Sequence, residues 1–557
     1  MKTKSKKQKK SALKDRVVSI WRDKSFLRHR FFYLTLAAAI FFIAILARTY
    51  HLTSLPPGIY PDEAVNGTDA INAIETGHFK LFYPNNYGRE GLFINLIALG
   101  FMLFGVNVIT LKIWAVFFGI LTVAGIMLLA RELFGTYRAG LVAGFLYATS
   151  FWAVNFSRIS FRANILPFVL VFTFYFLFKA LREKKFYDYI LAGIFFGLGM
   201  HTYIAFRIAP LILVALFIAF LLSKRNFLRE YWKPILAFSL AAFLVALPML
   251  LTFYFHPQYF ETRSESVSVL SLKVNQGHLW KALGTSIALT LEMFNFHGDQ
   301  NWRHNLPQYP ELEFFAGIFF LIGLGWTTGR FLYLFYLRVW KKRRREELIT
   351  DTLLLSWFLA MLLPGILTYE GLPHALRVIG VLPAVFLFVV FAIEKTFEII
   401  SRARPALLRN TSYLVLILII IWSGYANIKR YFVDWASAPQ IHPAFAQNFK
   451  NMALYLNGLP SNVNKYVIAN AGGQIMDDGL PVSAEVVKLL THYPTPGIVY
   501  VRPGFDPTII KPPAKIVLMY YDGESIARIK LFYPNAKLQK VDPQPGNGTD
   551  FFVINIY

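Results

Sequence analysis

Long apolar runs separated by short polar linkers are the feature that most constrains this sequence. A helix that crosses the hydrocarbon core of a bilayer needs about 20 predominantly apolar residues. Hydrophobic residues make up 56% of the 557-residue chain and charged residues 16%, whereas soluble domains hold about 45–50% and about 25%. The sequence therefore predicts a polytopic α-helical membrane protein with about eleven spans, at 31–49, 111–130, 139–156, 165–178, 189–204, 208–222, 235–255, 312–329, 353–368, 378–393 and 412–428.

The distribution of Lys and Arg predicts the orientation of these spans, because cytoplasmic loops carry an excess of both residues. Residues 1–30 and five linkers together hold 33 of them, and the alternate segments hold 10. The basic linkers, predicted to be cytoplasmic, are 131–138, 179–188, 223–233, 330–351 and 394–411. The predicted external loops are 50–110, 156–164, 201–207, 256–310 and 369–377.

The apolar run 91–104 allows two interpretations. As a twelfth span it would place the linker 131–138 outside and reverse every later loop, against the charge distribution. The sequence therefore favours a helix that lies along the external membrane surface. The basic stretch 341–345 is interpreted as a cytoplasmic loop rather than a nucleic-acid patch, because apolar spans flank it.

The composition changes after about residue 429. Residues 440–557 contain no apolar run of span length, and helical and strand-like stretches alternate, which is typical of an α/β domain. The predicted helices are 443–456, 484–490 and 525–531, and the predicted strands are 466–469, 498–501, 516–520 and 551–556. The sequence thus predicts a cytoplasmic basic N-terminus at 1–30, a transmembrane domain at 31–428 and a small extracytoplasmic α/β domain at 429–557.

Composition also limits the chemistry. The chain contains no Cys, which excludes disulfides, Cys-type zinc sites and a thiol nucleophile. A net charge of +25 would suggest nucleic-acid binding, but the charge lies in linkers that flank membrane spans. We therefore expect contact with membrane lipid and no nucleic-acid partner.

Two adjacent carboxylates, Asp62 and Glu63, follow the first span in the first external loop. A carboxylate held near a membrane surface can accept a proton from an acceptor hydroxyl, and a pair can bind a divalent cation through oxygen atoms. The alternative is a loop acid that caps a helix at 64–76. Spacing alone leaves both interpretations open.

Seven arginines lie in the predicted external loops, where basic residues are normally scarce, and five of them form the candidate set. A guanidinium group offers a planar set of donors to phosphate oxygens. The alternative for each arginine is anchoring at the lipid interface or an ion pair with a carboxylate such as Glu90. As a set they indicate phosphate binding: Arg89, Arg158, Arg162, Arg207 and Arg377.

Histidines and other polar side chains of these loops complete the candidate set. His297, His304 and His374 could bind a metal, but interfacial hydrogen bonding is favoured, so no metal site is predicted. Five further polar residues are expected to bind a substrate, and they are Glu90, Tyr203, Arg207, Asp299 and His304.

Four short segments, in order and spacing, resemble the GT-C class of polytopic glycosyltransferases. Within that class the similarity is to the protein O-mannosyltransferase and aminoarabinose-transferase superfamily, over residues 31–255 and more loosely beyond. The segments are Pro61-Asp62-Glu63-Ala64; 103–107 followed by Lys112; 130–135 with 138–140; and Phe156-Ser157-Arg158 with Arg162.

The resemblance implies a sugar donor linked to polyprenyl phosphate and an external C-terminal domain. It implies that Asp62 is the catalytic base, with Glu63 as a supporting or acceptor-binding acid. Family members often have a Lys-Pro-Pro stretch in which Lys binds the carrier phosphate, and Arg89 stands at that place here. Some relatives have Asp where this chain has Asn164.

We therefore predict an integral-membrane glycosyltransferase that moves a sugar from a polyprenyl-phosphate carrier to an acceptor hydroxyl at the external face of the plasma membrane, inverting the anomeric centre. The prediction includes no required cofactor and leaves a need for a divalent cation open. It does not identify the acceptor. The alternatives are a transporter or flippase for a lipid-linked anionic glycan, and a membrane anchor for a partner-binding domain. The residues expected to stabilise the phosphate are Arg89, Arg158, Arg162, His374 and Arg377.

Overall fold

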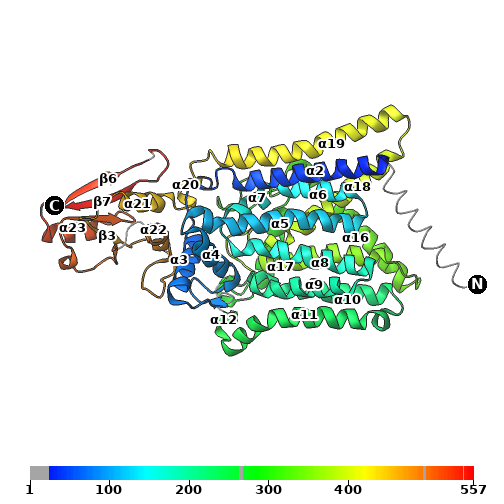
Figure 1. The fold of residues 1–557 in the computed structure, drawn as a ribbon, viewed down its shortest axis with the longest axis horizontal. Helices are drawn as coiled ribbons and strands as arrows, with labels where there is room; N and C mark the ends of the chain where they lie inside the picture. The colour runs from blue at the N-terminus through cyan, green and yellow to red at the C-terminus, as the bar shows by residue number, and fades with distance from the viewer. Residues whose placement is uncertain (1–23, 262–266, 493–496, 544) are drawn as a thin grey trace, which may run out of the picture.

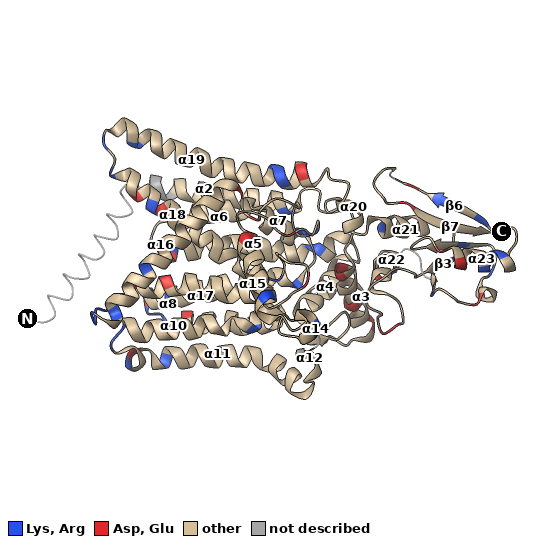
Figure 2. Cartoon of the chain, turned by 180° about the vertical axis from the view of Figure 1, so that it is seen from behind, with Lys and Arg blue, Asp and Glu red and all other residues tan. Residues whose placement is uncertain are grey.

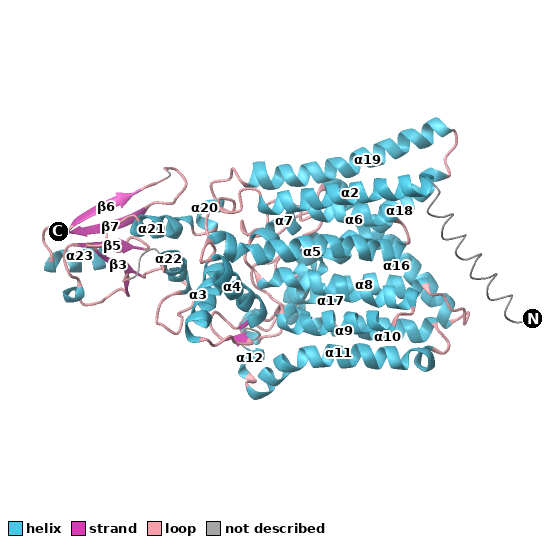
Figure 3. Ribbon diagram, viewed as in Figure 1, coloured by secondary structure: helices cyan, strands magenta, loops and turns pink. Residues whose placement is uncertain are grey.

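The computed structural model describes residues 24–261, 267–492, 497–543 and 545–557. Figure 1 shows a bundle of long helices and, beyond one end of it, a smaller region that carries the C-terminus. Figure 3 shows that the strands of the larger sheet all lie in this smaller region. Residues 1–23 of the predicted basic N-terminus lie outside the described residues.

Long apolar helices form the bundle and make the chain a multi-pass membrane protein. Among the described residues, nine helices are long and apolar enough to cross a membrane, and the pair α6–α7, bent by 58°, makes a tenth. The pair consists of α6 (Tyr137–Thr149) and α7 (Phe151–Arg158). The nine are α2 (Lys24–Thr49), α5 (Val108–Phe134), α8 (Ile165–Glu183), α10 (Pro210–Ser223), α11 (Phe227–Phe255), α16 (Phe314–Val339), α17 (Glu347–Ile366), α18 (Leu382–Ser401) and α19 (Ala406–Lys429).

The remaining predicted span, 189–204, coincides with a shorter helix. Helix α9 (Phe186–Leu198) has 13 residues and continues into a 3-10 turn at Gly199–His201. It packs against α8 and α11, side by side with the longer helices. Figure 1 places the start of α2 and the C-terminal region at opposite ends of the bundle, which requires an odd number of passages. Helix α9 therefore supplies the eleventh passage.

The five basic linkers gather at one end of the bundle, which we call the basic end. Arg182 pairs with Glu132, and Arg138 pairs with Glu394, so three linkers are joined directly. Lys224 lies 3.8 Å from Glu346 and joins the other two linkers. Figure 2 shows basic residues at this end, away from the C-terminal region. The contacts agree with the prediction that these linkers share one side.

The predicted external loops gather at the opposite end, which we call the site end. Helix α3 (Pro61–Thr76), the hairpin of β1 (Phe82–Tyr83) and β2 (Arg89–Glu90), and helix α4 (Gly91–Phe104) form its first layer. Helix α4 has 14 residues and packs against α3 and α5, as expected for a helix that does not cross the bundle. The other helices of this end are α12 (Gln258–Glu261), α14 (Leu272–Asn275) and α15 (Leu279–Glu292).

The C-terminal region is a small α/β unit. Its sheet has the order β4-β3-β5-β7-β6, with parallel pairs among β3, β4 and β5 and antiparallel pairs at β7. Apolar residues of β3 and β5 face both sides of the sheet, which is typical of strands covered on both faces. The elements are α20 (Ile441–Ala444), α21 (Gln447–Asn457), β3 (Asn464–Ile468), α22 (Glu485–Thr491), β4 (Val499–Val501), β5 (Ala514–Leu518), α23 (Gly523–Phe532), β6 (Lys537–Val541) and β7 (Phe551–Ile556).

Two features of this region differ from the sequence prediction. The predicted helix 443–456 is split because Ala446 adopts φ 51°, a left-handed conformation that interrupts helical hydrogen bonding. Strand β6 was not predicted, since its residues, KLQKV, are mostly polar and exposed at the sheet edge.

Helix α3 is held between the bundle and the C-terminal region. Helix α22 packs against α3, and a Cβ at Gly67 of α3 would lie 2.8 Å from Leu489. Lys450 of α21 donates hydrogen bonds to the carbonyls of Thr53 and Pro57, just before α3. The C-terminal region therefore fixes the helix that carries Asp62.

Candidate active site

Asp62 lies in the first turn of α3, with its side chain half-exposed at the site end. The helix begins after Tyr60, and Pro61 occupies its first position, where the missing N–H costs nothing. The amide of Asn86 donates a 2.6 Å hydrogen bond to Asp62 Oδ1. The positive end of the helix dipole favours a charged carboxylate at this position.

The surroundings of Glu63 fit the first of its two predicted roles, a supporting acid, rather than acceptor binding. Its side chain is fully buried, and its two oxygens accept hydrogen bonds from the backbone N–H groups of Tyr60 (3.0 Å) and Ser160 (2.8 Å). Burial raises the pKa of Glu63, opposed by Lys112 and by these two bonds. The structure therefore argues against Glu63 as an acceptor-binding acid, since both oxygens are occupied.

Arg89 is also buried and bonded within the fold. It donates hydrogen bonds to Asn66 Oδ1 (2.8 Å) and the Asn85 carbonyl (3.3 Å), and it forms an ion pair with Asp69 of α3. Burial lowers the pKa of Arg89, opposed by Asp69. The predicted phosphate-binding role is not supported, because this guanidinium ties the β1–β2 hairpin to α3.

Arg158 is a third buried residue whose predicted role the geometry argues against. Its guanidinium donates hydrogen bonds to the carbonyls of Ala47 (3.0 Å), Tyr50 (2.6 Å) and Leu55 (2.8 Å). These carbonyls lie where α2 ends, so Arg158 satisfies backbone groups that have no helical partner. It fixes the chain that leads from α2 to α3.

Two other arginines share one carboxylate. Glu90 Oε2 accepts a 2.7 Å hydrogen bond from Arg162 Nε, and Arg207 lies 3.9 Å from Glu90 Oε1. Arg162 lies over the ring of Tyr203 at 5.5 Å and also donates to the Gly88 carbonyl. This group therefore has one more positive than negative charge.

The β1–β2 hairpin connects this group to Asp62. Asn86 bonds Asp62 and Gly88 bonds Arg162, and the Cα atoms of residues two apart are separated by at most about 7 Å. Asp62 and Arg162 therefore lie along the same short segment. Of the predicted set, the structure brings together Asp62, Glu90, Arg162, Tyr203 and Arg207.

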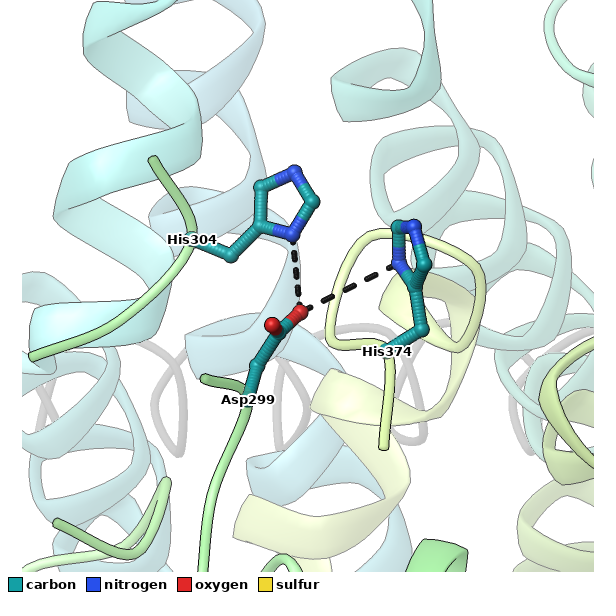
Figure 4. Close-up of side chains that lie close together, drawn as sticks. All are labelled: Asp299, His304 and His374. Atoms are coloured by element: carbon teal, nitrogen blue, oxygen red, sulfur yellow. Dashed lines mark hydrogen bonds and ion pairs between the residues drawn. The ribbon is translucent and has the colours of Figure 1, made fainter. Parts of the chain in front are cut away.

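A second group contains Asp299, His304 and His374 (Figure 4). Asp299 Oδ2 lies 2.7 Å from His304 Nδ1 and 3.9 Å from His374 Nδ1. Asp299 and His304 are buried, and His374 is largely buried. His297 lies apart from them: its side chain is 70% exposed, and its imidazole lies 3.9 Å from Glu292.

Arg377 belongs to the same loop as His374 but pairs within that loop. It donates hydrogen bonds to the carbonyl and, at 2.8 Å, the carboxylate of Glu370.

Arg303 is a candidate that the sequence analysis did not select. Its guanidinium lies 4.0 Å from the ring of Tyr60, two residues before Asp62, and its Nε donates to Asn301 Oδ1. Among the described residues, no carboxylate lies within ion-pair distance of Arg303. The backbone carbonyls of Arg303 and His304 accept hydrogen bonds from Asn155, which fixes this loop on α7. No spacing signal connects residues 62 and 303, so only the fold reveals their proximity.

Comparisons with known proteins agree with this architecture. Residues 92–251 match the family model described as dolichyl-phosphate-mannose-protein mannosyltransferase. The structure is similar to that of ArnT from Cupriavidus metallidurans bound to undecaprenyl phosphate, with a TM-score of 0.52, 12% identity, and coverage of 94% of this chain and 97% of that chain. ArnT in the apo state gives a TM-score of 0.53 at 12% identity, covering 96% and 99% of the two chains. The chain has the fold of a GT-C glycosyltransferase.

The structure of another enzyme is also similar to this chain. The apo oligosaccharyltransferase from Archaeoglobus fulgidus gives a TM-score of 0.51 at 16% identity, covering 87% of this chain and 65% of that chain. No curated protein sequence matches the chain. Together the partial family match and these similar structures agree on the GT-C fold.

The family match includes only some of the candidate site residues. Residues 92–251 run from α4 into α11 and include Arg158, Arg162 and Arg207. Asp62 precedes the matched segment, and Arg303 follows it. The roles of these two residues therefore depend on their geometry.

Proposed function

We propose that this protein transfers a sugar from a polyprenyl-phosphate carrier to an acceptor hydroxyl, with Asp62 as the general base. The observation that carries the proposal is that Arg303 lies over the ring of Tyr60, two residues before the partly exposed carboxylate of Asp62. A base and a cation that has no carboxylate partner are the two groups that such a transfer needs. The binding of undecaprenyl phosphate by the structurally similar ArnT supports the choice of donor.

In the proposed step, Asp62 accepts the proton of the acceptor hydroxyl as its oxygen attacks the anomeric carbon. The bond from this carbon to the carrier phosphate breaks, and the phosphate leaves with the bonding electron pair. A single displacement inverts the anomeric centre. Arg303, with Arg162 and Arg207, stabilises the charge that develops on the phosphate. The step needs no cofactor, since the chain supplies both the base and the cations.

The orientation is part of the same proposal. The basic end collects the Lys- and Arg-rich linkers, so by the charge rule it faces the cytoplasm. The site end, with Asp62 and the C-terminal region, then lies outside the plasma membrane. The C-terminal region packs directly on α3 and is suited to present the acceptor to Asp62.

The test is transfer by the full-length protein in proteoliposomes that contain a panel of polyprenyl-phosphate sugars, with released polyprenyl phosphate as the readout. We expect Asp62→Asn to lower the rate by about 10²–10⁴-fold, the range that a general base contributes. The matched control is Glu75→Gln, an exposed carboxylate near the end of the same helix. An unchanged transfer rate in Asp62→Asn would overturn the assignment of Asp62 as the base. Transport of the lipid-linked headgroup by the wild-type protein without release of polyprenyl phosphate would instead indicate a transporter.

A further inference from the structure

The group of Asp299, His304 and His374 has a geometry that glycosyl transfer does not use. Two loops supply it: the loop between α15 and α16 carries Asp299 and His304, and the loop between α17 and α18 carries His374. One potential ligand atom from each residue lies within 4.8 Å of the others. Within the part of the chain that the structure describes, this is the one group of three such side chains.

The residue types match the ligand preferences of a transition metal. Two imidazoles and one carboxylate are a common ligand set for Zn²⁺, and imidazole also suits Fe, Ni and Cu. Ligand atoms on a tetrahedral zinc ion lie about 3.3 Å apart, because each lies about 2.0–2.1 Å from the metal. The observed distances from Asp299 Oδ2, 2.7 Å to His304 and 3.9 Å to His374, lie on either side of that value.

The surroundings hold Asp299 in place. The backbone N–H groups of Ala375 and Asn301 each donate a 2.8 Å hydrogen bond to its carboxylate, one to each oxygen. Carboxylates that bind metals are typically oriented by such hydrogen bonds. The carboxylate is also only 2% exposed, so an ion bound to it would be shielded from water.

A metal-free Asp–His hydrogen bond is the simpler explanation, but it accounts for only one of the two Asp299–His contacts. It explains the 2.7 Å contact of His304 with Asp299. It does not explain why His374 directs Nδ1 toward the same oxygen at 3.9 Å, a distance too long for a direct hydrogen bond. Figure 4 shows both imidazoles turned toward this oxygen from two different loops.

We propose that Asp299, His304 and His374 bind one divalent transition-metal ion, with Zn²⁺ the best match, and that the ion ties the two loops together. Three protein ligands leave one position of a tetrahedral zinc ion open, which a single water molecule would fill although the site is shielded from bulk solvent. Because Arg303 precedes His304 directly, the ion also holds the loop that carries Arg303. The site is independent of whether the protein transfers a sugar.

The experiment measures zinc in the full-length protein purified in detergent, stripped with a chelator and dialysed against Zn²⁺. We expect one zinc ion per chain by elemental analysis, a higher Tm with Zn²⁺ than without it, and a tetrahedral absorption spectrum after replacement by Co²⁺. His374→Gln and Asp299→Asn should each weaken binding by more than about tenfold.

The control is His297→Gln, which removes an exposed histidine of the same loop region and should leave zinc content, Tm shift and Co²⁺ spectrum unchanged. Asp299→Asn removes a buried charge and can disturb folding, so the partly exposed His374 provides the second variant. Absence of stoichiometric zinc in the wild type, or equal loss in His297→Gln, would overturn the site. Because zinc content is measured without substrate, its outcome is separate from the transfer assay.

Discussion

The two ends of the bundle pair their arginines differently. At the basic end, Arg138, Arg182 and Arg330 each bind both oxygens of one carboxylate, on Glu394, Glu132 and Asp351. At the site end, Arg162 and Arg207 share Glu90, and Arg303 lies against an aromatic ring. The basic end uses these arginines to join helices. The site end also pairs Arg89 and Arg377 with single carboxylates, but two arginines share Glu90 and Arg303 has no carboxylate within ion-pair distance among the described residues, so positive charge stays available for an anion.

Among the arginines, the largest expected effect is that of removing the Arg303 guanidinium. Arg303→Ala should lower kcat/KM for transfer by about 10²–10³-fold, because one donor to the leaving group is lost. Arg303→Lys should recover part of the rate, since it keeps the charge but not the planar set of donors. The measurement is release of polyprenyl phosphate, with Lys273→Ala, an exposed cation of the same end, as the control. An unchanged rate in Arg303→Ala would remove the distinction between the two ends.

Removing the shared carboxylate tests whether two arginines depend on it. Glu90→Gln should lower the free energy of unfolding by about 3 kcal/mol, because two largely buried cations lose their counter-charge. Thermal unfolding in detergent measures the loss. Glu370→Gln removes an exposed partner of Arg377 and should cost less than about 1 kcal/mol. Equal losses in the two variants would show that Glu90 is no more important than a surface acid.

Breaking an ion pair at the basic end should change the stability only slightly and leave transfer intact. Glu394→Gln breaks a bidentate pair with Arg138, whose side chain is 40% exposed. Solvent screens such a pair, so we expect a change of about 1 kcal/mol or less in unfolding free energy and an unaltered transfer rate. A large fall in transfer with normal stability would show that this end takes part in the reaction.

The smallest expected effect concerns pH and separates two neighbouring carboxylates. Burial raises the pKa of Glu63 above 4.5, so above pH 4.5 the folded protein holds this proton more firmly than the unfolded chain. The stabilising contribution is present below pH 4.5 and is lost as pH rises through the raised pKa. Glu63→Gln should flatten this part of the stability profile and lower stability at every pH, because the Gln amide can accept only one of the two backbone hydrogen bonds. Asp62→Asn should instead leave the shape of the profile unchanged and lower transfer. Unfolding at several pH values measures the difference.

The sequence was sufficient for features that depend on local composition. The apolar runs predicted the passages through the membrane, the charge rule predicted which linkers share one end, and the run 91–104 became α4 with the expected bounds. Strand β7 also spans the predicted residues. Each of these features follows from hydrophobicity or charge along a short segment.

Individual arginines could not be assigned in the same way. Arg89 and Arg158 have the residue type and the loop position of phosphate ligands, but Asp69 and the carbonyls at the end of α2 bind them inside the protein. Arg303 has the same residue type, yet it lies against the ring of Tyr60 with no carboxylate within ion-pair distance among the described residues. The difference depends on partners that are distant in sequence.

The amino-acid sequence by itself determined that the chain crosses the membrane repeatedly and carries an α/β region after the last span, because burial of apolar surface depends on composition within each segment. Only the tertiary structure decided which charged groups are neutralised and which stay available. A guanidinium changes its function when a carboxylate or carbonyl comes within about 3 Å, and such partners are brought together by helix packing rather than by neighbouring residues.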